Sequence, residues 1–157
     1  MTHSERPVLL EIEDLKVHFS IRDNKQWFWQ PAKSLKAVDG VTVRLYEGET
    51  LGVVGESGCG KSTFARAIIG LVKSTAGRVT WLGKDLCGMS EKDWHNVRND
   101  IQMIFQDPLA SLNPRMTIGD IIAEPLRTYY PSMSKTEVTD KVKAMMMKVG
   151  LLPNLVN

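Results

Sequence analysis

The chain has 157 residues, of which 43% are hydrophobic, and 20 Lys and Arg against 18 Asp and Glu give a net charge of +2. This length and composition are typical of one globular domain and argue against a disordered chain. The small charge gives no case for nucleic acid binding, which needs a concentrated basic patch. No apolar run approaches the roughly 18–20 residues that cross a bilayer, and the N-terminus lacks the apolar core of a signal peptide. We therefore expect a soluble, cytosolic protein.

Alternating apolar and polar residues predict two strands near the N-terminus, at 8–21 and 35–45. The polar stretch between them carries Trp27, Phe28 and Trp29, which we interpret as a loop packed on itself, with a partner contact as the alternative. The short apolar run 50–54 is typical of a buried parallel strand, and the segment 62–72 has the apolar spacing of a helix. Strand, loop and helix in this order form half of a βαβ unit.

The second half of the chain predicts a strand at 77–82, a short helix capped at Ser90, a strand at 101–105 and two further helices. The first of these two helices is capped at Thr117 and is limited or kinked by Pro125. The second begins at a capping box, in which Ser134 and Glu137 have the required spacing, and it stops at Gly150. We expect its apolar face to consist of Val138, Val142, Met145, Met146 and Val149.

A glycine-rich loop follows the apolar run 50–54 and matches the phosphate-loop pattern G-x-x-x-x-G-K-[ST] in full. Its residues are Gly55, Glu56, Ser57, Gly58, Cys59, Gly60, Lys61 and Ser62, and Thr63 extends the pattern. Glycines let several backbone N–H groups converge on one anion, and the following helix points its N-terminal donors at the same anion. We expect Lys61 to lie between the β- and γ-phosphates of a nucleotide and the Ser62 hydroxyl to bind Mg²⁺.

The residues around this loop resemble the ATP-binding subunits of ABC transporters. The resemblance rests on LGVV leading into GESGCGKST, on IQMIFQDP at 101–108, and on the longer run FQDPLASLNPRMT, which is similar to the ATPases of bacterial peptide and nickel importers. The aromatic insert at 25–31 and the run LPNLVN at 152–157 most resemble the second ATPase subunit of oligopeptide importers. The resemblance covers nearly the whole chain, from about Val8 to Asn157.

The resemblance implies an α/β fold, in which a RecA-like P-loop NTPase core carries an N-terminal antiparallel β region and the start of the ABC helical subdomain. We expect the β region and core at 1–107 and the continuation with the partial helical subdomain at 108–157 of one partial domain, 1–157. In this family an aromatic residue in the first strands stacks on adenine, and the matching position is Phe19, with a core residue as the alternative. The glutamine of the family's Q-loop matches Gln106, whose amide oxygen can meet Mg²⁺ or the attacking water without carrying charge.

The resemblance also implies ATP and Mg²⁺ as cofactors and a set of partners. These are a second ABC ATPase subunit, two transmembrane permease subunits docked on about 108–150, and an extracytoplasmic peptide-binding protein. It places the protein on the cytoplasmic face of the bacterial inner membrane and gives it a role in coupling ATP hydrolysis to oligopeptide uptake.

The sequence departs from the family in what it lacks. It contains no LSGGQ motif, no apolar strand ending in Asp-Glu and no switch histidine, so we expect the N-terminal half of a subunit that binds nucleotide without efficient turnover. The strands 50–54 and 101–105 would then lack neighbours and expose apolar surface. An alternative hypothesis is a small P-loop kinase or GTPase in which Asp107 is the carboxylate that binds Mg²⁺.

Overall fold

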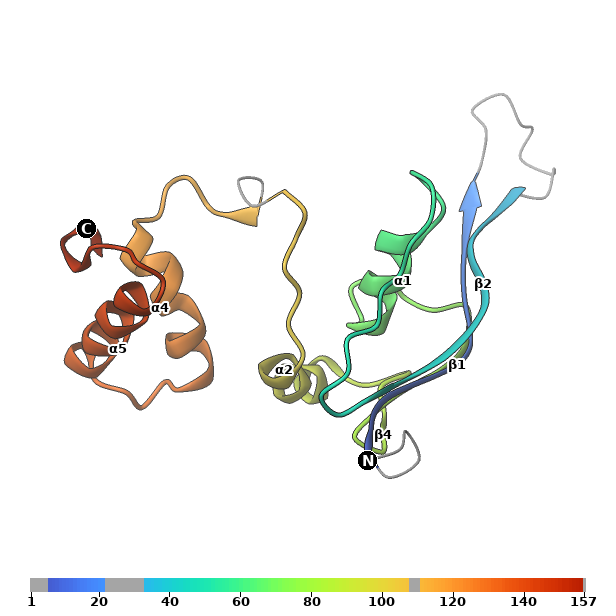
Figure 1. The fold of residues 1–157 in the computed structure, drawn as a ribbon, viewed down its shortest axis with the longest axis horizontal. Coiled ribbons are helices and arrows are strands. Elements are labelled where there is room, and N and C mark those ends of the chain that lie inside the picture. Colours follow the sequence, from blue (N-terminus) through green and yellow to red (C-terminus); the bar gives the residue numbers. More distant parts are fainter. Residues whose placement is uncertain (1–5, 22–32, 108–110, 157) are drawn as a thin grey trace. The chain divides into compact units, whose positions relative to one another are not determined.

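The computed structural model describes residues 6–21, 33–107 and 111–156, and the chain divides into two compact units, Met1–Gln102 and Met103–Asn157 (Figure 1). The aromatic insert at Trp27, Phe28 and Trp29 lies outside the described residues. None of the helices in the described part of the chain has the length and apolarity that a membrane-spanning helix needs.

The first unit contains an antiparallel sheet with the strand order β2-β1-β3-β4. The two long strands are β1 (Val8–Ile21) and β2 (Lys33–Tyr46), which confirms the strands expected from the alternating pattern. They are followed by β3 (Ala76–Trp81) and the short β4 (Lys84–Asp85). The sheet is the N-terminal antiparallel β region that the family resemblance implies.

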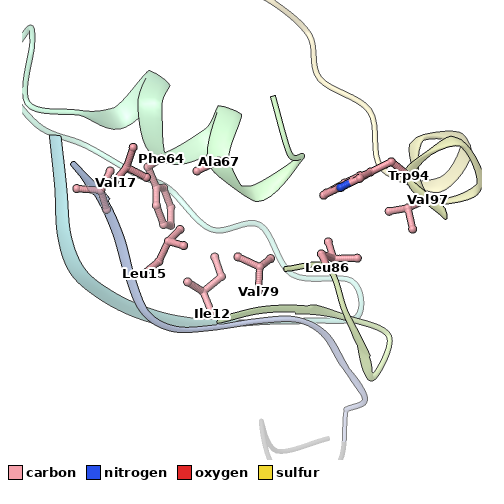
Figure 2. Close-up of a cluster of buried hydrophobic side chains, with 10 residues drawn as sticks. Ile12, Leu15, Val17, Phe64, Ala67, Val79, Leu86, Trp94 and Val97 are labelled. Carbon is pink, nitrogen blue, oxygen red and sulfur yellow. The ribbon is translucent and has the colours of Figure 1, made fainter. Parts of the chain in front are cut away.

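The helix α1 (Lys61–Ile68) packs on this sheet and forms the core of the first unit (Figure 2). Phe64 and Ala67 of α1 lie over Ile12, Leu15 and Val17 of β1, which are all buried. The helix α2 (Glu91–Asp100) adds Trp94 and Val97 to the same cluster. Burying one such side chain contributes about 1.5–3 kcal/mol, so this cluster holds α1 against the sheet.

The sequence predicts a helix over 62–72, but the observed helix α1 is shorter and ends at Ile68. Gly70 has a φ of +70°, and the N–H groups of Leu71 and Val72 both donate to the Arg66 carbonyl at 2.9 and 3.2 Å. A left-handed glycine with such bonds ends a helix by satisfying its last carbonyl groups. The apolar residues beyond Ile68 therefore belong to the turn.

The prediction of strands at 50–54 and 101–105 is wrong, because neither segment forms a strand in the structure. A strand needs a neighbour that accepts and donates its backbone hydrogen bonds, and among the described residues the sheet consists of β1 to β4 alone. The expected exposure of apolar surface is confirmed, with 92% of Val54 and 98% of Ile104 exposed.

The second unit consists of α4 (Ile118–Tyr129), α5 (Lys135–Lys148) and the 3-10 turn η2 (Pro153–Val156). The capping box is confirmed, because Glu137 N donates to Ser134 Oγ and Ser134 N donates to Glu137 Oε2. Pro125 lies inside α4 without ending it.

The apolar face of α5 is narrower than the sequence predicts. Val138, Val142 and Met146 are buried against Ala123 of α4, whereas Met145 and Val149 are exposed, which corrects the expected stripe. Residues spaced by four share one side of a helix, and α4 covers only that side.

Candidate phosphate-binding site

The loop 55–60 connects the exposed segment 50–54 to the first turn of α1. Gly60 is the N-cap of α1 and has a φ of +96°, and the first helical bond runs from Phe64 N to Gly60 O at 2.8 Å. Because the first N–H groups of a helix have no intrahelical acceptor, those that precede Phe64 remain donors for a ligand. They carry the positive end of the helix dipole, which favours an anion.

Gly60 is also a point of close approach between the loop and β2. A Cβ atom added at Gly60 would overlap the carbonyl oxygen of Ala37, and Val38 lies next to it. Gly58, with a φ of +81°, is the second left-handed residue of the loop and has open space around it. The loop conformation thus depends on glycine at both positions, for steric contact at one and for the backbone angle at both.

The ammonium group of Lys61 is held at the centre of the loop. Its Nζ donates to the carbonyl oxygens of Gly55 at 2.8 Å and Glu56 at 2.6 Å, and it lies 3.6 Å from Cys59 Sγ. These bonds fix a positive charge in the concavity beside the helix N-terminus. A fixed cation with converging N–H donors can bind the oxygens of a di- or triphosphate.

The residues expected to bind Mg²⁺ lie in different units. Ser62 stands in the first turn of α1 with its side chain exposed, next to Lys61. Gln106 is exposed and belongs to the unit Met103–Asn157, so its place in the site stays a prediction. Within the described residues no group of three or more His, Cys, Asp or Glu could hold a metal ion by itself. The Ser62 hydroxyl is an oxygen ligand of the kind that Mg²⁺ prefers, and it fits an ion whose other ligands include phosphate oxygens.

Phe19 lies near the end of β1, opposite Leu35 of β2, and 40% of it is exposed. Ala37, two residues beyond Leu35 on β2, is the residue that contacts Gly60 of the loop. The same two strands thus carry an exposed aromatic ring and the contact with the loop. This location is compatible with stacking on a base, which stays a prediction.

A cleft of about 470 Å³ opens beside the loop, between β2 and the segment 50–54. Its walls are mostly apolar and include Val41, Val43, Leu51 and Val53, with Lys61 at one end. The cleft also reaches Cys59 and Gly60 of the loop, so it borders the proposed phosphate site.

The sequence analysis missed the contact of β2 with the loop and a charged cluster beside it. Asp39 accepts hydrogen bonds from His18 Nε2 at 2.9 Å and from Lys36 Nζ at 3.0 Å. No spacing rule in the sequence predicts this cluster, because it depends on the register of β1 against β2.

The profile of the ABC transporter family matches residues 38–155 of this chain. The oligopeptide transport ATP-binding protein OppF of Salmonella typhimurium is 78% identical over 98% of this chain, and that of Escherichia coli is 80% identical over 97%. The alignment covers 46% of each of these two proteins, so the chain spans about half the length of the curated relatives it matches.

A solved structure of the ATP-binding cassette MJ0796, a dimer bound to ADP and Pi, matches 95% of this chain with a TM-score of 0.78. The chain covers 60% of that structure, and the sequence identity of 22% supports a shared fold alone. It confirms the expected P-loop α/β fold. From the match to the family profile over most of its length, the chain belongs to the ABC transporter family.

Proposed function

We propose that this chain binds ATP through the loop 55–63 and forms part of the ATP-binding subunit of an oligopeptide ABC importer. The observation that carries the proposal is the position of Lys61, whose ammonium is held by two loop carbonyls beside the N-terminus of α1. The importer and its substrate class come from the names of the OppF relatives. The alternative of a small kinase or GTPase with Asp107 as a metal ligand is not proposed, because the chain belongs to the ABC transporter family.

In this proposal each residue has a separate task. Lys61 binds the β- and γ-phosphate oxygens, the N–H groups of the loop and of the first turn of α1 surround them, and Ser62 offers its hydroxyl to Mg²⁺. When bound, Mg²⁺ neutralises charge on the phosphates. Phe19 contributes a ring face to adenine, and Gln106 offers its amide oxygen to the metal or to water.

The assembly and the turnover are also proposals. The proposed partners are a second ATPase subunit, two transmembrane permease subunits and an extracytoplasmic peptide-binding protein, at the cytoplasmic face of the bacterial inner membrane. The region 1–107 is assigned to the β region and P-loop core and 108–157 to the helical subdomain. Since the 157 residues contain no LSGGQ motif and no Asp-Glu strand, we propose that they bind nucleotide without efficient turnover.

Calorimetric titration with Mg²⁺-ATP tests the binding site. Lys61→Ala should weaken binding by at least about tenfold, because it removes a charge-assisted contact with phosphate. The control is Lys143→Ala, which removes an exposed lysine of α5 and should leave the affinity unchanged. Equal affinity of Lys61→Ala and the parent would exclude the loop as the phosphate site.

ATP turnover by the purified 157-residue chain, with its intact mass checked against 17.6 kDa, tests the second part of the proposal. Binding without turnover is the expected result. Robust Mg²⁺-dependent turnover that Lys61→Ala abolishes would show that these residues contain a complete catalytic site.

A further inference from the structure

Two side chains of the first two strands, His18 and Lys36, meet at the carboxylate of Asp39. His18 Nε2 of β1 donates to Asp39 Oδ1 at 2.9 Å, and Lys36 Nζ of β2 donates to Asp39 Oδ2 at 3.0 Å. An ionised carboxylate can only accept, so the ring nitrogen of His18 that faces Asp39 carries a proton. The cluster of His18, Lys36 and Asp39 thus ties the two strands together. The proposed function gives it no task.

The cluster surrounds a β-bulge. Val17 lies opposite Val38 and His18 lies opposite Lys36, so Ala37 is an extra residue of β2 with no residue opposite it on β1. A bulged residue leaves the regular ladder and bends its strand locally. The carbonyl oxygen of this extra residue is the one that lies against Gly60 of the phosphate loop.

The bulge is fixed from outside the loop. Lys36 precedes Ala37 in the chain and Asp39 follows it two residues later, and the hydrogen bond between their side chains spans this segment of β2. His18 connects this pair to β1, where the His18 backbone N–H donates to Thr75 Oγ1 at 2.8 Å. Because Gly60 is the N-cap of α1, a shift of the Ala37 carbonyl would move the N–H donors that face the phosphates.

We propose that His18, Asp39 and Lys36 are positioning residues of the phosphate loop, which hold the Ala37 bulge against Gly60. The inference rests on the proposed nucleotide-binding function and adds to it a role for three residues outside the loop. They act through the backbone of Ala37 and do not touch the nucleotide.

The surroundings of the cluster keep its carboxylate charged. Hydrogen bonds from Lys36 and then from His18 hold the pKa of Asp39 below its ordinary value of 3.8, so Asp39 stays ionised. Lys16 on β1 also faces Asp39 and pairs with Asp14 at 2.9 Å.

The test measures binding of inorganic tripolyphosphate and of ATP to the purified protein. Asp39→Asn should weaken both ligands by a similar factor, about three- to fivefold, as expected for a partly exposed charge pair. The matched control is Glu11→Gln, because Glu11 pairs with Arg44 across the same two strands, away from the bulge. Glu11→Gln should leave both affinities unchanged.

A conservative variant at position 18 separates positioning from a merely structural effect. Glutamine can still donate a hydrogen bond to Asp39, so His18→Gln should bind tripolyphosphate nearly like the parent. Alanine cannot donate this bond, so His18→Ala should bind tripolyphosphate about three- to fivefold more weakly. Both variants keep Asp39 and Lys36, so the comparison stays decisive if Asp39→Asn fails to fold.

Three results would overturn the inference: equal effects of Asp39→Asn and Glu11→Gln, loss of ATP but not of tripolyphosphate binding in Asp39→Asn, or equal tripolyphosphate affinities of His18→Ala and the parent. If Lys61→Ala binds both ligands like the parent, the phosphate site itself is wrong, and the proposed function fails together with this inference. If Lys61→Ala loses binding while the cluster variants keep it, the inference alone fails.

Discussion

The indole ring of Trp94 in α2 lies against Gly70, the left-handed residue that ends α1. A Cβ atom added at Gly70 would overlap three carbon atoms of the six-membered ring. Trp94 is buried, and the guanidinium of Arg98 lies 5.6 Å from the centre of its ring. The turn that ends α1 and the position of α2 therefore depend on each other, because the Trp94 ring occupies the space that a side chain at position 70 would need.

Gly70→Ala should destabilise the protein by about 1–3 kcal/mol through overlap with Trp94, in addition to about 1 kcal/mol for a left-handed alanine. Gly83→Ala is the matched control, because Gly83 also has a positive φ but has open space where the Cβ would lie. It should cost about 1 kcal/mol, from the backbone alone. Urea unfolding measures both values, and equal losses would mean that the contact with Trp94 carries no cost.

Met146 and Met145 are neighbours on α5 with opposite surroundings, since Met146 is fully buried and 50% of Met145 is exposed. Met146→Ala should lower the free energy of unfolding by about 2–4 kcal/mol, because it leaves a cavity against α4. Met145→Ala should change it by less than about 0.5 kcal/mol. Chemical denaturation followed by circular dichroism tests the pair, and a larger loss at Met145 would contradict the packing of α4 on α5.

Phe19→Ala should weaken ATP binding by about five- to tenfold and leave the affinity for tripolyphosphate unchanged, because a ring face contacts a base and not a phosphate. Phe19→Tyr, which keeps the ring, should bind ATP like the parent. Val8→Ala, at an exposed position at the start of the same strand, is the control. Parallel loss of both ligands in Phe19→Ala would point to a general disturbance of β1.

The second unit should lose stability in acid. The hydrogen bond from Thr117 and then that from Arg127 lower the pKa of Asp120 from 3.8, and the hydrogen bonds from Ser134 lower the pKa of Glu137 from 4.5. A carboxyl group with a lowered pKa in the folded state stabilises the fold above its ordinary pKa. This contribution is lost as the pH falls, because the unfolded chain binds protons first.

We therefore expect the contribution of these two groups to thermal stability to be constant above about pH 5. It should decline as the pH falls below 4.5 and then below 3.8, the ordinary pKa values of Glu137 and Asp120. The double variant Asp120→Asn, Glu137→Gln should show a shallower decline than the parent. Differential scanning calorimetry across this range makes the comparison, and an equally steep decline in both proteins would show that the two helix caps do not cause it.

Local patterns in the sequence were sufficient for several parts of the protein. The two long strands, the capping box at Ser134 and the glycine-rich loop that leads into α1 all follow from rules that act within a few residues. Alternation selects a strand, a hydroxyl accepts a bond from the first helical N–H groups, and glycines adopt the positive φ that a tight loop needs. These rules describe contacts between residues that are close together in the chain, so the amino-acid sequence is sufficient to predict them.

The remaining features depend on neighbours that are distant in the chain, and the tertiary structure decided them. The segments 50–54 and 101–105 have the composition of buried strands, yet they form none where no strand pairs with them. Likewise α4 determines that Met146 rather than Met145 is buried, and Trp94 meets the turn that ends α1. The Ala37 bulge has no signal in the sequence, because the pairing of β1 with β2 alone creates it and brings its carbonyl to Gly60.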